Sequence, residues 1–398
     1  FGALCRILAK CGGEIRNLSG AAEELYKFFE TDAEYSERLK KVIESMKSPE
    51  PELLTRKNVR AIYGDVIALS ATKLEKYNDC AFSYFMRYGL VAKERVSGKL
   101  DSRDTGSIQH NALYRYFSEL KFNNADYGEI TYDRCRKRVC EIVEQAAKEN
   151  SELLYESSFY FKYIVSRMQG IVTRTAWETI KFYKSGAFRP YGYEIKIATG
   201  GDIPTICIKA DDGTDLAHLH GFIDRADTAV INGKTYVSII DYKSSKTDLD
   251  SALTDAGVKL QPLLYSDIVC KRLNASPAAM LYMQMTDPII KAENLKSDEN
   301  SAVELAKSKE VDFGGWVNND AAVIANYSNG ENGETFLPSK NHFMSESEMT
   351  EHIEKANENI KNAARGIYKG NISAKPFVCK GHSACTYCPY SLSCSKEE

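Results

Sequence analysis

The sequence predicts an α/β protein in which a mixed sheet is surrounded by helices. Up to about residue 183 apolar residues recur with a period near 3.6, which is typical of helices. From residue 191 apolar and polar residues alternate in short segments, which is typical of strands. Helical periodicity then returns twice. The predicted order is an α-rich region, an αβββαβ unit, and a last helix followed by cysteine-rich loops.

Composition narrows the class of protein. The 398 residues are 43% hydrophobic and 27% charged, which excludes a disordered chain, a collagen and a small disulfide scaffold. No run approaches the roughly 18 apolar residues that would span a membrane. The net charge of −3 provides no overall attraction to DNA, so DNA would need a local groove or a bound metal. Because the chain starts at Phe1 without a signal sequence, we interpret it as a fragment of a longer polypeptide.

The N-terminal region is expected to be helical to about residue 47. Leu4, Ile7 and Leu8 begin the periodic pattern, and prolines at 49 and 51 interrupt it. We therefore divide the chain into residues 1–60, a helical region with a linker, and residues 61–398, the main domain.

The elements of the main domain follow from local patterns. Thr72 to Glu75 form a capping-box pattern that would open a helix through Cys80. The further elements expected are an extended stretch at 61–69, an amphipathic helix from Ile108, strands at 191–197, 218–230, 235–243 and 279–285, a helix at 258–272, an insertion or loops at 286–345, and a helix at 346–368 that ends before Gly370.

One hairpin brings two acids together. Asn232-Gly233 between two alternating segments predicts a two-residue type I′ turn. If Ile231 faces Lys234, opposed residue numbers always sum to 465, so Asp224 faces Asp241. Opposed carboxylates repel each other unless a cation lies between them.

The apolar neighbours of these acids favour a functional interpretation. Lys243 shares their strand face by the two-residue alternation. So do four apolar residues that mark the core side of the sheet: Phe222, Ala226, Val237 and Ile239. Because buried carboxylates need a partner, the pair predicts a divalent cation with Lys243 beside it, and a solvated surface pair is the alternative.

Cysteines gather at the C-terminal end. Of eleven cysteines, four lie in the last twenty residues: Cys379, Cys385, Cys388 and Cys394. Scattered thiols suit a reducing compartment, and a close cluster suits a metal. Cys385, Cys388 and Cys394 supply three thiolates, and Cys379 or His382 could complete a local zinc site. Cys135, Cys140, Cys207 and Cys270 are interpreted as core residues.

Four motifs together resemble a known family. Gly221-Phe-Ile-Asp224-Arg and Ile240-Asp241-Tyr-Lys243-Ser resemble the D…(D/E)-x-K core of the RecB-type PD-(D/E)XK nucleases, and the family's other two motifs have counterparts in Gly106-Ser-Ile-Gln-His110 and Gln261-Pro-Leu-Leu-Tyr265. The resemblance implies a restriction-endonuclease-like fold and metal-dependent hydrolysis of DNA.

The same resemblance implies the roles of the site residues. His110, Asp224 and Asp241 would hold Mg²⁺ or Mn²⁺, and Lys243 would orient or activate a water. Gln261 and Tyr265 would position the DNA backbone. Glu194, on the strand before the hairpin, could assist the metal or its water.

A second resemblance concerns the cysteines. Tyr77-Asn-Asp-Cys80-Ala-Phe, with the C-terminal spacing, is similar to the AddB/RexB family of B subunits of bacterial helicase–deoxyribonucleases. It implies a 4Fe–4S cluster on Cys80, Cys385, Cys388 and Cys394, in place of the zinc alternative.

The AddB/RexB resemblance also implies a setting. The partners would be an AddA/RexA-type helicase–nuclease subunit and single-stranded DNA at a duplex end, in the bacterial cytoplasm with no membrane contact. Residues 1–60 would close the preceding helicase-like region. A Cas4-like stand-alone exonuclease and a catalytically vestigial DNA-end clamp remain the alternatives.

Overall fold

The computed structural model describes residues 1–10, 15, 18–46, 53–92, 102–150, 155, 158–290, 303, 306–308, 311, 313–328, 343–379 and 381–394. The helices are α1 (Gly2–Lys10), α2 (Ala21–Thr31), α3 (Ser36–Met46), α4 (Arg56–Tyr63), α5 (Ala71–Asp79), α6 (Ala81–Tyr84), α7 (Ser102–Phe122), α8 (Tyr132–Asn150), α10 (Phe159–Ser185), α11 (Ser251–Asp255), α12 (Gln261–Leu273), α14 (Ala321–Ser328) and α15 (Glu346–Tyr368). The strands are β1 (Ile67–Leu69), β2 (Arg189–Ile197), β3 (Ile206–Lys209), β4 (Asp215–Leu219), β5 (Gly221–Ile231), β6 (Lys234–Lys243), β7 (Ser276–Gln284), β8 (Phe313–Asn318), β9 (Phe343–Met344), β10 (Val378–Cys379) and β11 (His382–Ser383).

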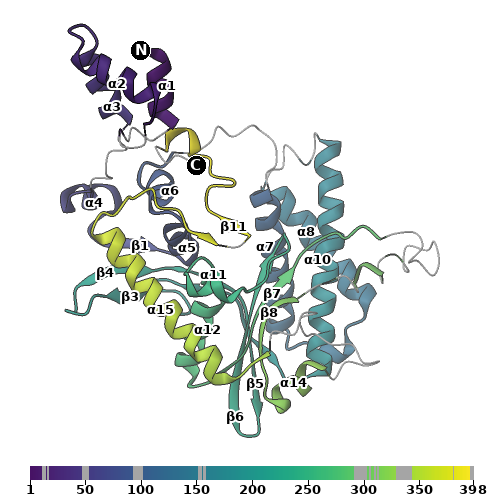
Figure 1. Cartoon of the computed structure of the whole chain (residues 1–398). Helices are drawn as coiled ribbons and strands as arrows, with labels where there is room; N and C mark the ends of the chain where they lie inside the picture. Colours follow the sequence, from purple (N-terminus) through teal and green to yellow (C-terminus); the bar gives the residue numbers. More distant parts are fainter. Residues whose placement is uncertain are drawn as a thin grey trace.

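A mixed six-stranded sheet in the order β2-β5-β6-β7-β8-β9 forms the centre of the molecule. Its β6–β7 and β8–β9 pairs are parallel and the others are antiparallel. One face packs against α5, α12 and α15, and the other against α7, α8 and α10 (Figure 1). Alternate β6 residues follow this division, since Ile239 joins the first core and Ile240 the second. The predicted α/β class is confirmed.

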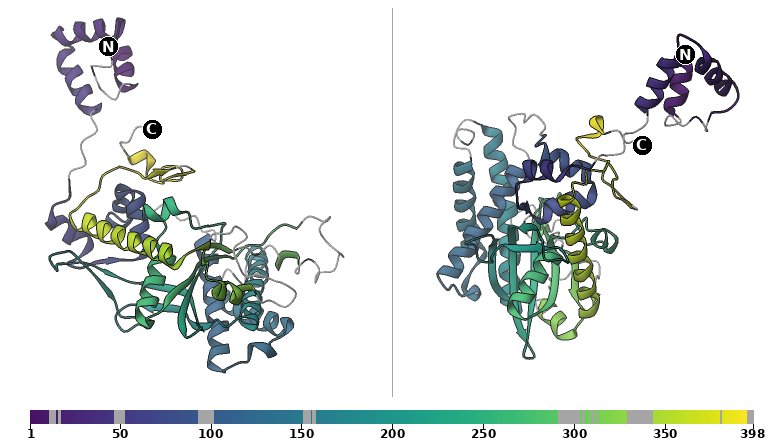
Figure 2. Two further views of the ribbon diagram at one scale, coloured as in Figure 1. Left: turned by 60° about the horizontal axis from the view of Figure 1, so that its bottom comes forward. Right: turned by 90° about the vertical axis from the view of Figure 1, so that its left-hand side faces the viewer.

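The N-terminal helices have a core of their own. Five buried residues of this region form a separate cluster: Leu4, Leu8, Leu18, Leu39 and Ile43. Figure 2 shows α1, α2 and α3 as a group apart from the sheet and its helices. The division predicted at residue 60 falls inside α4, which packs against α15, and Leu54 N donates to Gly370 O at 2.9 Å.

The hairpin has the predicted turn and register. Asn232 and Gly233 both have positive φ, 51° and 78°, as a type I′ turn requires. The pairs run from Ile231↔Lys234 to Arg225↔Ile240, so the sum of 465 holds along the hairpin.

Several local predictions are wrong. The 61–69 stretch is helical up to Tyr63 and becomes β1 only at Ile67. The predicted 218–230 strand is two strands, because β4 leaves at Leu219 for a three-stranded sheet in the order β1-β4-β3. Part of the 286–345 segment is not a loop, since β8 and β9 extend the main sheet and α14 lies between them.

The capping-box prediction at Thr72 is also wrong. The N-cap of α5 is Ser70, whose hydroxyl accepts from Lys73 N at 3.3 Å. The carboxylate of Glu75 is thereby left for another partner. At the C-terminal helix the prediction is confirmed to the residue: α15 spans Glu346–Tyr368, and Gly370 follows with φ +79°.

Candidate active site

Three predicted metal-ligating side chains converge at one end of the sheet. His110 Nδ1 lies 3.5 Å from Asp224 Oδ2 and 3.5 Å from Glu194 Oε1. A ligand atom from each of the three lies within 4.8 Å of those of the other two. His110 comes from α7, Glu194 from β2 and Asp224 from β5, so the group joins the helical layer to the sheet.

The register of β2 on β5 explains why Glu194 belongs to this group. Tyr193 pairs with Arg225 and Ile195 with Ile223, so Glu194 stands directly opposite Asp224. Its φ of +46° is unusual for a residue with a side chain, and such conformations concentrate at functional sites. Glu194 was the least supported of the predicted ligands, and the structure places it in contact range of two others.

Asp241 follows on the other side of Asp224. The last hairpin pair is Arg225↔Ile240. The same register continued by one position would oppose Asp224 to Asp241, and the charge of Asp224 acts on the Asp241 carboxylate. At this position the ladder gives way to a side-chain bond, because Tyr242 N donates to Asp224 Oδ2 at 2.8 Å. Glu194, Asp224 and Asp241 thus form a row of carboxylates across β2, β5 and β6, which we call the acidic row. Asp241 is not in the His110 group that lies within 4.8 Å.

Lys243 is held between two of the motif residues. Its Nζ lies 2.6 Å from Asp241 Oδ2 and donates to Gln261 Oε1 at 2.7 Å. The Asp241 carboxylate is buried, 2% exposed, and its Oδ2 makes no well-aligned hydrogen bond despite the nearby ammonium. Tyr265 is buried one turn after Gln261 on α12, on the same side of the helix.

The acids and bases of the site perturb one another. Burial, followed by the charge of Asp224, raises the pKa of Asp241 to about 7, although Lys243 opposes the shift. Burial alone would lower the pKa of His110, but Asp224 and Glu194 outweigh it and raise the pKa to about 10. Burial likewise disfavours the Lys243 ammonium, and the charges of Asp241 and Asp224 outweigh it, so the pKa of Lys243 is raised.

Glu75 is a contact that the sequence did not predict. Its Oε1 accepts from Leu260 N at 2.7 Å and from Gln261 N at 3.1 Å, at the start of α12. Burial raises the pKa of Glu75, while these two amides and the Lys243 ammonium oppose the shift. The only sequence signal was its place in the Thr72 pattern, which suggested a local cap, whereas the bond spans 185 residues.

The donor set fits a hard divalent cation. Carboxylate oxygens with one imidazole nitrogen suit Mg²⁺ or Mn²⁺. Burial and the charge of Asp224 disfavour the charged form of Asp241, and a cation bound between the two carboxylates would stabilise that form. Among the described residues one further group of three ligand atoms lies within 4.8 Å: Cys207, Asp215 and His218 on the β3–β4 hairpin. There Asp215 is exposed and is paired with Lys209 at 3.7 Å.

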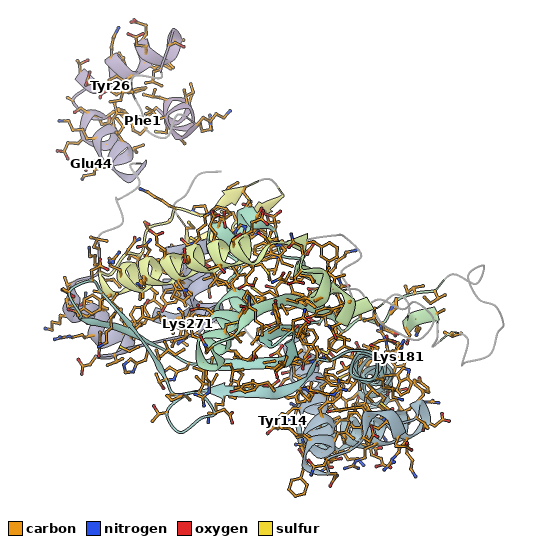
Figure 3. The ribbon with its side chains drawn as sticks, turned by 90° about the horizontal axis from the view of Figure 1, so that it is seen from below. Phe1, Tyr26, Glu44, Tyr114, Lys181 and Lys271 are labelled. Carbon is orange, nitrogen blue, oxygen red and sulfur yellow. The ribbon has the colours of Figure 1, made fainter. Side chains whose placement is uncertain are left out.

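A cleft of about 640 Å³ opens beside the acidic row. His110 and Glu194 line it, and Phe222 and Tyr114 lie on its rim at 51% and 42% exposed. Tyr114, on α7, is labelled in Figure 3. The prediction that Phe222 lies in the core is wrong: Ala226, Val237 and Ile239 are buried, but their core continues at Ile223, and Phe222 points into solvent beside it. A larger cavity of about 810 Å³ at the other end of α7 contains none of the motif residues.

The C-terminal segment returns to the helix that precedes Cys80. Phe377 N donates to Asp79 O at 2.7 Å, and His382 Nε2 lies 2.8 Å from Asp79 Oδ1. Tyr390 OH donates to Ala92 O at 2.9 Å. Figure 1 shows this segment, in yellow, beside α5 and α6. The fold therefore brings the C-terminal cysteines toward Cys80, which lies about 300 positions earlier in the chain.

The ionisation of Cys80 is influenced by two C-terminal cysteines. The pKa of Cys80 is raised mainly by burial, and the thiolates of Cys394 and Cys388 add to the shift. None of the ten described cysteines is in a disulfide. A tetrahedral zinc site would bring its sulfurs to about 3.8 Å from one another, given Zn–S bonds near 2.3 Å. The four predicted cluster cysteines are all among the described residues, and no three of them lie within 4.8 Å of one another.

The other cysteines are only partly in the core. Cys135 and Cys270 are buried as predicted, whereas Cys140 and Cys207 are partly exposed. None of the described helices is both long enough and apolar enough to span a membrane.

A buried ion pair follows the site residue Asp224 along β5. Arg225 and Asp227 are 2% and 0% exposed, and Arg225 donates twice to Asp227 Oδ2, at 2.9 and 2.6 Å. Tyr183 OH donates to Asp227 Oδ1 at 2.8 Å, and Arg225 Nη1 donates to Thr179 Oγ1 at 3.0 Å. The pair thereby attaches β5 to α10.

Comparison with known proteins agrees with this geometry. The family described as the PD-(D/E)XK nuclease superfamily matches residues 68–395. The curated relatives are named as the B subunits of ATP-dependent helicase/deoxyribonucleases. That of Clostridium acetobutylicum is 28% identical over 400 residues, 95% of this chain and 34% of the relative. Those of Caldanaerobacter subterraneus subsp. tengcongensis and Clostridium novyi are 29% and 28% identical over 94% and 99% of this chain, and 34% and 36% of the relatives.

The chain therefore spans about a third of the length of these relatives. The resemblance to B subunits, inferred from the nuclease motifs and the cysteine spacing, is confirmed at this level of identity.

Proposed function

The chain belongs to the PD-(D/E)XK nuclease superfamily, and from this premise we propose that it is the metal-dependent deoxyribonuclease part of a helicase–nuclease B subunit. Its reaction would be hydrolysis of phosphodiesters in a single DNA strand at a duplex end. The observation that carries the proposal is the convergence of His110, Glu194 and Asp224 beside Asp241 and Lys243.

The residues divide the chemistry between them. His110, Asp224 and Asp241, with Glu194, would hold one Mg²⁺ or Mn²⁺, which when bound makes a water nucleophilic and neutralises charge on the phosphate. Lys243, fixed at 2.6 Å from Asp241, would place its ammonium beside the phosphate, where negative charge grows as water attacks phosphorus and the leaving oxygen departs.

The cleft supports a single-stranded substrate. Its rim presents two exposed aromatic rings, Tyr114 and Phe222, and bases stack on such rings without sequence preference. Gln261 and Tyr265 would hold the backbone from α12. A duplex keeps its bases stacked on one another, so this mode of contact favours an unpaired strand.

The decisive test compares two lysines of one strand. In the full-length protein, Lys243→Ala and Asp241→Ala should each remove magnesium-dependent cleavage of single-stranded DNA, with the fold retained by circular dichroism. Lys234→Ala is the matched control, because Lys234 lies on the same strand and pairs with Glu346 at 2.6 Å, away from the site. Undiminished cleavage by Asp241→Ala would overturn the proposed function.

For the cysteines we propose a structural 4Fe–4S cluster on Cys80, Cys385, Cys388 and Cys394. The C-terminal segment anchored on Asp79 supports it, because it brings the C-terminal cysteines toward Cys80. Reduced thiols and such a cluster suit the bacterial cytoplasm.

Anaerobically purified protein tests this assignment. We expect iron and sulfide in equal amounts with visible absorption, lost in Cys80→Ser and kept in Cys379→Ser. Stoichiometric zinc that persists in Cys80→Ser and disappears in Cys379→Ser would establish the local zinc alternative in its place.

The partner would be an AddA/RexA-type helicase–nuclease subunit. The names of the relatives and their greater length support a component of a complex over a Cas4-like stand-alone exonuclease. End binding without metal-dependent cleavage would identify a vestigial clamp instead.

A further inference from the structure

Helix α12 begins without a cap from its own neighbourhood. The first amides of a helix have no partner within it and are usually capped by a polar side chain at the N-cap. Here the N-cap is Leu260, whose side chain cannot accept a hydrogen bond. Glu75 of α5 accepts instead from Leu260 N and Gln261 N, at 2.7 and 3.1 Å. A carboxylate at this end also complements the helix dipole.

The residue that Glu75 fixes is the one that holds Lys243. Gln261 is the first residue of α12, and its side-chain Oε1 accepts from Lys243 Nζ at 2.7 Å. Lys243 Nζ in turn lies 2.6 Å from Asp241 Oδ2. A continuous series of contacts, each of 3.1 Å or less, therefore leads from Glu75 to the acidic row.

Contacts between helix α5 and other segments fix the position of Glu75. Asn78 Nδ2 donates to Gly257 O at 2.9 Å, in the turn before α12. Gly257 has φ +74°, and a Cβ there would lie 2.4 Å from Asn78 Nδ2, so only glycine permits this approach. Asp79 at the end of the helix bonds the C-terminal segment through Phe377 and His382.

We propose that Glu75 is a positioning residue for phosphodiester hydrolysis: it fixes the first turn of α12 so that Gln261 holds the Lys243 ammonium in the site. This inference rests on the proposed nuclease function and adds to it a residue outside the four motifs. In this role Glu75 acts through Gln261 and Lys243, so its loss is expected to lower the rate of the chemical step and to spare DNA binding.

The test uses the full-length protein and three variants. Glu75→Ala removes the cap, and Glu75→Gln keeps a carbonyl oxygen that can accept from both amides. Asp250→Ala is the matched control. Asp250 caps α11 in the same manner, accepting from Ala252 N at 2.9 Å and Leu253 N at 3.2 Å. Among the described residues, no hydrogen bond joins Asp250 to Gln261.

Glu75→Ala should lower kcat for single-stranded DNA by about 10- to 100-fold, since sub-ångström to 1 Å displacements of catalytic groups have effects of this order. KM, and DNA affinity measured with Ca²⁺ in place of Mg²⁺, should stay unchanged. Glu75→Gln should recover most of kcat, and Asp250→Ala should retain it. Equal kcat in Glu75→Ala and Asp250→Ala would overturn the proposal, and so would a loss confined to KM.

A second measurement separates this inference from the proposed function. Amide hydrogen exchange at Leu260 and Gln261 should speed up in Glu75→Ala whether or not DNA is cleaved. Active wild-type protein with faster exchange but unchanged kcat in Glu75→Ala would remove the positioning role and leave the nuclease. No cleavage by wild-type protein with Mg²⁺ or Mn²⁺ would remove both.

Discussion

Strand β5 carries two neighbouring groups of charged side chains, and the surroundings of the two groups differ. In the first group, Arg225 and Asp227 form a buried pair with two bonds of 2.9 Å or less, and Tyr183 and Thr179 satisfy further atoms. In the second group, Asp224 has a histidine 3.5 Å away and two carboxylates on the neighbouring strands.

The difference distinguishes a structural charge from a functional one. A buried ion pair is tolerated when every donor and acceptor has a partner, as at Arg225 and Asp227. The acidic row places like charges side by side, and the buried Asp241 carboxylate is paired with the Lys243 ammonium at 2.6 Å. Such an arrangement costs stability in the absence of a cation and gains it when one binds.

The largest expected effect is on the free energy of unfolding and concerns the Arg225–Asp227 pair. Asp227→Leu leaves the Arg225 guanidinium buried without its counter-charge, and removing one partner of a buried pair typically costs about 3–5 kcal/mol. We therefore expect a loss of this size in the free energy of unfolding, measured by urea denaturation, with Mg²⁺ making no difference to the loss.

The double variant is the control for this loss. Arg225→Met with Asp227→Leu removes both charges, and apolar replacements of buried pairs are often near neutral. It should be more stable than Asp227→Leu alone. Equal losses in the single and double variants would show that the cost comes from packing and not from the unpaired charge.

The sequence predicted one side of the site well because the turn that fixes it is local. Asn232-Gly233 determines the register of β5 on β6, and with it the approach of Asp224 to Asp241. No short turn connects β2 to β5, so the register that places Glu194 opposite Asp224 could not be derived from the chain alone. Glu75 was assigned to a local cap because a contact across 185 residues leaves no periodic signal.

Local patterns also failed to predict the exposure of Phe222 and the strands β8 and β9 at the edge of the sheet. Alternation assigned Phe222 to the core face, but its neighbour Ile223 is the buried residue in the same core as Ala226, so the alternation shifts by one residue near Asp224. Strands β8 and β9 lie in a polar, Asn/Gly-rich segment, and their pairing with β7 and with each other depends on long-range contacts. Local patterns located the end of α15 because its terminal glycine, Gly370, follows closely in the sequence.

The next largest effect is the stabilisation of the folded protein by a cation at the acidic row. A divalent cation that binds only the folded protein stabilises it by about 2.7 kcal/mol at 100 times its Kd. We expect Mg²⁺ or Ca²⁺ to raise the midpoint of thermal unfolding of the wild-type protein, and Asp224→Asn to abolish the increase. Asp227→Leu should keep the increase on its lower baseline. An equal increase in Asp224→Asn would place the cation elsewhere.

The smallest effect has the opposite sign to the first. Because the pKa of Asp241 is raised to about 7, the folded protein binds a proton at this group that the unfolded chain has lost above about pH 4. The contribution of Asp241 to stability therefore falls as the pH rises from about 4 to 7. Asp241→Asn should stabilise the metal-free protein by about 1 kcal/mol at pH 8, because it removes a buried charge and its repulsion from Asp224, and by little at pH 5, where the acid is already neutral.

Urea denaturation of wild-type and Asp241→Asn protein in EDTA at the two pH values measures this difference. Lys243 loses its partner in the variant, which limits the gain. A stabilising substitution that removes cleavage would show that the acidic row is maintained for the reaction at the expense of the fold. Destabilisation at pH 8 would mean that the Asp241–Lys243 pair stabilises the fold by more than the repulsion from Asp224 destabilises it. Both charged groups would then contribute to stability.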